Sequence, residues 1–145
     1  MVEAWILVVA GIALLIGVCI LSCCCYTASW KRKVIRKSDS LSKIIETPQG
    51  PVEVFVKGNA PYVLAFFGSP SVHDGAYGLF DEFHEAGFGI ISPSRPGYGR
   101  TPLSSGKTYK EQPPLYAAML DKLGVDKVVV HTISGGGPAG YSFAH

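Results

Sequence analysis

Ser134 lies in a segment whose composition suits nucleophilic chemistry. A β-branched, apolar run over residues 127–133 precedes it, and Gly135, Gly136 and Gly137 follow it. A serine on a sharp turn between a strand and a helix must tolerate a strained backbone, so its neighbours must be small enough for the two elements to approach closely. Such a serine can attack an acyl carbon and form an acyl-serine intermediate, which water then hydrolyses.

A nucleophilic serine needs a general base within hydrogen-bond reach and an acidic group behind that base. His131 lies ~10 Å back along the same strand with its side chain on the other face, and Asp126 lies ~26 Å away at the far end of the strand run. His145 would lie ~14 Å along the following helix. Distance along the chain does not exclude His73 and His84 as partners.

The elements around Ser134 follow the order that builds a parallel sheet. Five runs have the length and composition of strands: residues 42–46, 52–57, 62–67, 88–92 and 127–133. The first two are expected to form a hairpin, and residues 76–86 and 114–123 are expected to form helices. The later order of strand, helix, strand, helix, strand predicts an α/β fold with a mostly parallel sheet flanked by helices.

The segment around Ser134 resembles the nucleophile elbow of the α/β-hydrolase family, whose pattern is G-x-S-x-G. Gly136 occupies the last position of that pattern, and Thr132 stands where the family usually has its first glycine. The resemblance implies that Ser134 is the catalytic nucleophile.

Two further segments resemble motifs of the same family and occur in the same order. Residues 67–70, Phe-Gly-Ser-Pro, resemble the H-G-x-P loop, with phenylalanine in place of histidine. The resemblance implies that Ser69 and Gly135 supply the two backbone N–H groups of an oxyanion hole. Residues 94–99 resemble the D-R-P-G-x-G turn with Ser94 in place of aspartate, and we expect this turn to shape its loop.

The family takes its acid and its histidine, in that order, from positions beyond the nucleophile. We therefore expect both groups to be absent from this chain, and residues 42–145 to be an incomplete α/β-hydrolase domain, truncated after the elbow and inactive by itself. The strand over residues 128–133 would then be an open, apolar edge of the sheet. The resemblance implies an ester or other acyl substrate, small-molecule or lipid, and no metal or organic cofactor.

Other interpretations of the same residues remain open. Ser134 could cap the following helix. Gly135, Gly137 and Gly140 also spell G-x-G-x-x-G, the phosphate-binding pattern of dinucleotide folds, but no acidic residue follows at the required spacing of ~20 positions. A non-catalytic, membrane-anchored binding module with the same fold is the alternative from a different functional class.

The first thirty residues differ from the rest of the chain. No charged side chain occurs between Ala4 and Trp30, and a helix over residues 4–26 would be ~34 Å long, enough to cross a hydrocarbon core of ~30 Å. We expect residues 1–30 to be a transmembrane anchor and residues 31–41 a basic linker; a cleaved signal peptide is the rival interpretation.

The flanks of this apolar segment predict its orientation. Five basic residues follow it: Lys31, Arg32, Lys33, Arg36 and Lys37. None precedes it, so the positive-inside rule predicts a single-pass protein with its carboxyl-terminal domain in the cytoplasm. The overall net charge of +2 is too small to indicate a nucleic-acid partner.

The cysteines are confined to the apolar segment. Cys23, Cys24 and Cys25 lie at its cytoplasmic end, where S-palmitoylation is one expectation and plain apolar packing the other. Cys19 lies within it, and none of the four cysteines falls in the later domain. Disulfides are therefore not expected to hold that domain together.

Overall fold

The computed structural model describes residues 2–145, and the side chains of residues 5–145. The chain divides into two compact units, Met1–Asp39 and Ser40–His145. The second unit contains every residue that the hydrolase resemblance singles out.

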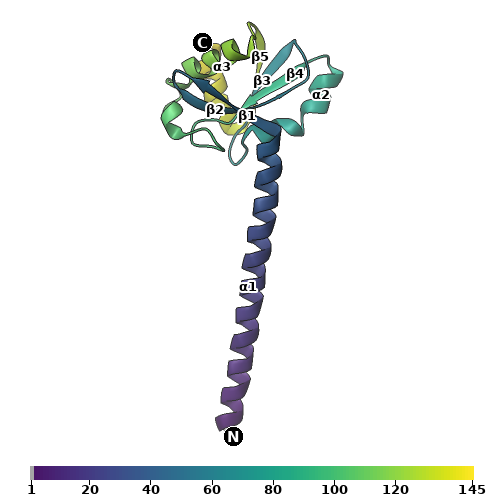
Figure 1. The fold of residues 1–145 in the computed structure, drawn as a ribbon, viewed down its shortest axis with the longest axis vertical. Helices are drawn as coiled ribbons and strands as arrows, with labels where there is room; N and C mark the ends of the chain where they lie inside the picture. Colours follow the sequence, from purple (N-terminus) through teal and green to yellow (C-terminus); the bar gives the residue numbers. More distant parts are fainter. Residues whose placement is uncertain (1) are drawn as a thin grey trace. The chain divides into compact units, whose positions relative to one another are not determined.

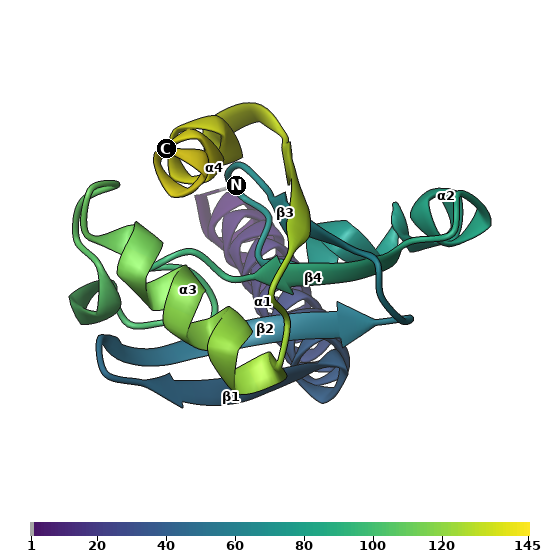
Figure 2. The ribbon, with the colours of Figure 1, turned by 90° about the horizontal axis from the view of Figure 1, so that it is seen from above.

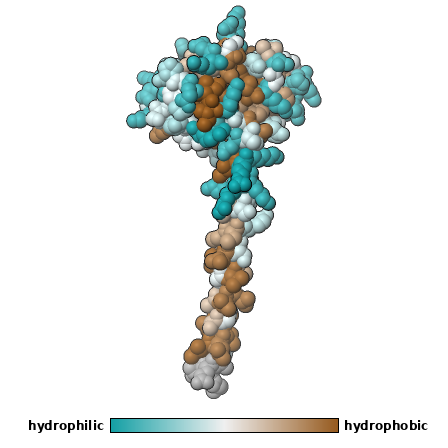
Figure 3. Space-filling model, in the orientation of Figure 1, coloured by the Kyte–Doolittle hydropathy of each residue, from teal (hydrophilic) through white to brown (hydrophobic). Residues whose placement is uncertain are grey.

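The first unit consists of one helix, α1 (Val2–Leu41), which continues into the start of the second unit (Figure 1). By length and composition it could cross a membrane. Figure 3 shows apolar residues along the helix, followed by hydrophilic ones. Residues 31–41, which the sequence assigns to a linker, are helical. The reason is local, because no glycine or proline occurs between Gly17 and Pro48 and the basic residues favour a helix.

The second unit is built on a five-stranded sheet with the order β1-β2-β4-β3-β5 (Figure 2). Its strands are β1 (Ser42–Thr47), β2 (Gly50–Lys57), β3 (Tyr62–Phe66), β4 (Gly89–Pro93) and β5 (Val128–Thr132). β3 pairs in parallel with β4 and with β5, as the order of elements predicts. The β1–β2 and β2–β4 pairings are antiparallel. The expected β1–β2 hairpin is confirmed. The sheet is mixed, and the prediction of a mostly parallel sheet is wrong, because β2 also pairs with β4 in the antiparallel direction.

The helices of this unit are α2 (Phe80–Glu85), α3 (Gln112–Leu123) and α4 (Gly137–Ala144). Single 3₁₀ turns also occur: η1 (His73–Tyr77), η2 (Leu103–Ser105) and η3 (Ser134–Gly136). The helix expected over residues 76–86 is thus divided into η1 and the short α2, with Gly78 between them. Glycine weakens a helix because it loses the most backbone freedom on folding.

The sheet is buried on both faces, which explains the unbroken apolar run of β3. Leu64 and Phe66 point into one cluster with residues of α3 and α4. Val63 and Ala65 point into a second cluster with residues of η1 and α2. Alternation of side chains along a strand places successive residues on opposite faces, so a strand covered on both sides is apolar at every position.

β5 forms one edge of the sheet and pairs with β3 alone. Its Val129 side chain is 53% exposed. Val128 and Val130, on the alternate face, pack against the α3 and α4 cluster. The expected open, apolar edge is thus present in the part of the chain that the structure describes.

Candidate active site

Ser134 lies at the turn between β5 and α4 with an exposed side chain. Its φ angle is +52°, and it is the one non-glycine residue with positive φ in the described part of the chain. A left-handed backbone at such a residue costs of order 1–3 kcal/mol and persists only where the surroundings impose it. The turn is held by backbone hydrogen bonds from Ile133 N to Phe66 O and from Gly136 N to Ile133 O, both 2.9 Å.

Glycines let this turn approach the end of β3. A Cβ atom placed on Gly68 would lie 2.6 Å from the Gly135 nitrogen and 2.9 Å from Ser134 Cβ. One placed on Gly136 would collide with the Phe66 carbonyl group, and one on Gly135 would lie 3.7 Å from the Ser69 nitrogen. The backbones of Ser69 and Gly135 therefore lie on adjoining segments beside Ser134.

The departure from the family pattern at Thr132 is accommodated by a glycine in α4. A Cβ atom on Gly140 would collide with Thr132 Cγ2 and would lie 3.1 Å from Phe66 Cδ2. Thr132 thus occupies the space that a larger residue at position 140 would need. The last glycine of the G-x-G-x-x-G pattern has this packing role, which requires no dinucleotide.

Replacing Gly68 by alanine tests this close approach. We expect Gly68→Ala to lower the free energy of unfolding by about 1–3 kcal/mol, because its Cβ would overpack against the backbone of Gly135. Gly137→Ala is the matched control: its backbone is helical, with φ −52° and ψ −52°, and its Cβ would meet nothing within 4 Å. This control should be neutral or slightly stabilising. Equal stability of the two variants in urea unfolding would contradict the close approach.

The histidines of the second unit are engaged elsewhere than at Ser134. The His84 ring stacks on Phe80 with centroids 5.1 Å apart, and the His131 ring meets Phe83 edge-on at 5.3 Å. The His145 ring lies 4.4 Å from that of Tyr141. Within residues 5–145, no hydrogen bond joins the Ser134 hydroxyl to a histidine or a carboxylate.

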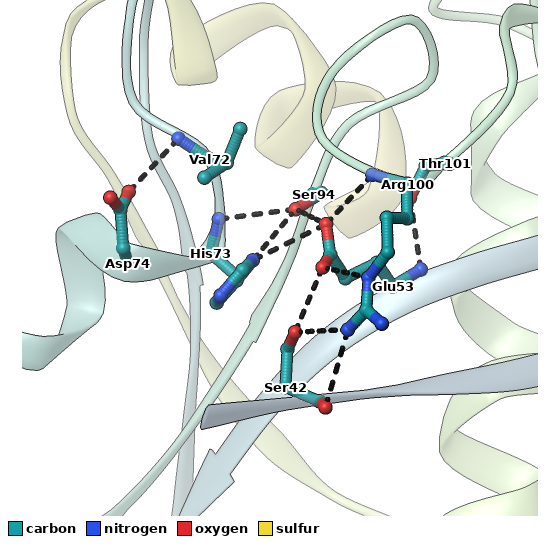
Figure 4. Close-up of polar contacts among 8 residues, drawn as sticks. All are labelled: Ser42, Glu53, Val72, His73, Asp74, Ser94, Arg100 and Thr101. Carbon is teal, nitrogen blue, oxygen red and sulfur yellow. Dashed lines mark hydrogen bonds and ion pairs between the residues drawn. The ribbon is translucent and has the colours of Figure 1, made fainter. Parts of the chain in front are cut away.

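A buried polar network lies around Glu53 of β2, whose side chain is fully inaccessible (Figure 4). The carboxylate accepts hydrogen bonds from Ser42 Oγ at 2.8 Å and Ser94 Oγ at 2.9 Å. It also accepts from Arg100, through Nε at 2.7 Å and the backbone N–H at 2.9 Å. Burial alone would raise the pKa of Glu53, but hydrogen bonds from His73, Arg100 and Ser42 hold it well below its usual range.

Ser94, His73 and Glu53 have the residue types of a catalytic triad but not its geometry. Ser94 Oγ and Glu53 Oε2 both meet Nδ1 of His73, at 3.1 and 3.4 Å, whereas a triad uses opposite ring nitrogens. All three side chains are buried, so no substrate can reach Ser94. The network instead ties the loop after β3 to the turn after β4. In the sequence, the sign of this network is Glu53 itself, a single charged residue inside the apolar run 52–56.

The turn after β4 contacts both residues expected to hold an oxyanion. Arg95 Nη1 donates a hydrogen bond to the Gly135 carbonyl oxygen at 3.1 Å. The Tyr98 hydroxyl donates to Ser69 Oγ at 3.3 Å, and the Arg95 guanidinium lies 4.5 Å from the centre of the Tyr98 ring. This turn, expected from the sequence to shape its loop, therefore also braces the candidate site.

Comparison with known proteins agrees with this fold. No protein-family profile matches the chain. The uncharacterized hydrolase YcgS of Bacillus subtilis is 39% identical in a match of 97 residues, which covers 62% of this chain and 34% of that protein. The α/β-hydrolase fold protein from Nakamurella multipartita is 40% identical with a TM-score of 0.67, over 71% of this chain and 36% of the other. Epoxide hydrolase VrEH1 from Vigna radiata is 25% identical with a TM-score of 0.62, over 70% and 34%.

The chain spans about a third of the length of these relatives. Within that span the second unit shares its fold with α/β-hydrolases.

Proposed function

We propose that the second unit carries the nucleophile of a serine hydrolase of the α/β-hydrolase type, acting on esters or other acyl bonds. Ser134 attacks the acyl carbon, and the N–H groups of Ser69 and Gly135 stabilise the resulting oxyanion. The observation that carries the proposal is the left-handed backbone of Ser134 at an exposed turn between strand and helix. Glycine would adopt this backbone without strain, so a serine kept there at an energetic cost indicates a function for its hydroxyl group. The hydrolase names of the relatives support the same reaction class.

Serine chemistry favours acyl substrates over the epoxides of the Vigna radiata enzyme. A serine oxygen that opened an epoxide would form an ether, which water does not readily cleave. A serine oxygen that attacks an ester forms a second ester, which water can hydrolyse to free the enzyme. Turnover at Ser134 therefore favours an acyl compound over an epoxide.

A chimera tests the nucleophile. Residues 42–145 would replace the matching segment of Bacillus subtilis YcgS, which would supply the rest of a hydrolase domain. We expect a fluorophosphonate probe to label the chimera at Ser134 and to leave its Ser134→Ala variant unlabelled. Ser104→Ala, at an exposed serine outside the site, should label normally. Labelling of parent YcgS but not of the folded chimera would refute the proposal.

A non-catalytic binding module is the second candidate. It is favoured by the lack of a hydrogen bond between Ser134 and any histidine within residues 5–145. The chimera separates the two, because a binding module has no need of a reactive serine. Labelling that survives in the Ser134→Ala variant at the level of the chimera would remove Ser134 from any catalytic role.

We further propose that α1 anchors the chain in a membrane as a single-pass helix, with residues 40–145 in the cytoplasm, where lipid esters are accessible substrates. Protease added to intact cells should then leave a carboxyl-terminal tag uncut, and cutting of the tag would refute the orientation.

Palmitoylation of Cys23, Cys24 and Cys25 remains a prediction. The prediction is wrong if a variant with alanine at these three positions carries as much hydroxylamine-sensitive acyl label as the unaltered chain.

A further inference from the structure

Arg95 is a buried cation without an acidic partner. Its side chain is 7% exposed, and within residues 5–145 it forms no ion pair. Nη1 donates to the Gly135 carbonyl oxygen, and Nε has no hydrogen-bond partner. Burial of an unpaired guanidinium carries a desolvation cost of several kcal/mol, which an anion can offset. The flat guanidinium group suits carboxylates and phosphates, which it binds in a bidentate manner.

A surface pocket of about 350 Å³ lies beside this arginine. Arg95 and Lys107 supply its two positive charges, Tyr98 and Tyr109 also line it, and no acidic residue is among its lining residues. Glu111, the nearest acid along the chain to Lys107, is engaged with a backbone, because its carboxylate accepts the Lys107 N–H at 2.8 Å. The volume is within the range of small-molecule sites.

Two residues of the pocket also contact the residues proposed for the oxyanion hole. Arg95 binds the carbonyl of Gly135, and Tyr98 binds the hydroxyl of Ser69. A group bound in the pocket would therefore lie beside the loops that carry Ser69 and Gly135. One substrate molecule could occupy both positions.

We propose that this pocket is an anion subsite, which selects acyl substrates that carry a carboxylate or a phosphate group near the bond to be cleaved. Arg95 and Lys107 bind the anion, while the ester extends toward Ser134. The role in substrate selection rests on the proposed function, but binding of the anion requires no reaction at Ser134.

Binding to the full 145-residue chain in detergent micelles tests the subsite. The ¹⁵N signal of Arg95 Nε–H would be followed during titration with monomethyl succinate, with neutral dimethyl succinate and with inorganic phosphate. We expect saturable shifts with monomethyl succinate or phosphate and none with dimethyl succinate. The anion that displaces the other identifies carboxylate or phosphate as the preferred group.

Lys107→Ala should weaken binding about tenfold, the loss of one charge-assisted contact. Lys110→Ala removes an equal charge from an exposed position outside the pocket and should leave the affinity within about twofold. Equal effects of the two substitutions, equal binding of the neutral diester, or no shift with either anion would overturn the proposal. Ser134→Ala should bind the anion like the unaltered chain. Failure of the chimera to be labelled would therefore refute the hydrolase and leave the anion site standing.

Discussion

The 145-residue chain is expected to react with a fluorophosphonate probe about 10³-fold or more slowly than the chimera with YcgS. Within residues 5–145, no histidine forms a hydrogen bond with the Ser134 hydroxyl. A serine without a base is a poor nucleophile at neutral pH, and removal of a triad member costs several powers of ten in rate. The remaining slow reaction would come from stabilisation of the oxyanion alone.

The labelling rates would be measured at pH 7 by gel fluorescence, with peptide mapping of the labelled serine. Circular dichroism of the chain must first show its folded signal, so that slow labelling reports missing chemistry. Labelling of the chain at Ser134 at the rate of the chimera would contradict this prediction. A base outside the observed contacts would then have to act on Ser134.

Glu53→Gln should lower the free energy of unfolding by about 3 kcal/mol. The amide keeps the shape of the carboxylate but loses its charge, so it can no longer accept all the donors that converge on it from Ser42, Ser94 and Arg100. Pulse proteolysis in urea would measure the change. Glu46→Gln, at an exposed position of β1, is the matched control and should change stability by less than about 0.5 kcal/mol. Equal loss in both variants would contradict the structural role of the network.

The same carboxylate gives stability a pH dependence of definite sign. The pKa of Glu53 in the folded chain is lowered from its usual value of 4.5. Its contribution is therefore fully present above pH 4.5 and is lost as the pH falls toward the folded pKa, because only the unfolded chain then takes up the proton. The difference in stability between the unaltered chain and Glu53→Gln should narrow below pH 4.5. A difference that stays constant from pH 6 to pH 3 would contradict the lowered pKa.

Local pattern was enough to predict the elements that position Ser134. The unbroken apolar run of β3 and the glycines after Ser134 each report a local requirement: burial on both faces, and close approach of a helix to a strand. The expected order of strands and helices holds because each element carries its own signal. The helix expected over residues 76–86 is wrong in its bounds, because Gly78 separates the 3₁₀ turn η1 from the shorter helix α2.

The contacts that brace the site could not be predicted, because they join residues far apart in the sequence. Ser94 and Glu53 are 41 residues apart, and Arg95 and Gly135 are 40 apart. Which glutamate meets which arginine depends on the order of strands in the sheet. Pairing of β2 with β4 brings Glu53 beside Ser94, and the local pattern of the hairpin contains no information about that pairing.

The left-handed backbone at position 134 determines which residue should be enriched there when a library of variants is selected for folding or for activity. Glycine adopts this conformation without steric cost, so it should stabilise the turn, whereas alanine removes the hydroxyl and keeps the strain. Selection of a position-134 library for folding alone should therefore enrich glycine over both serine and alanine. Selection of the same library in the chimera for ester cleavage should enrich serine at position 134. The ratio of serine to glycine in a selected library would thus show whether reactivity or folding had been selected.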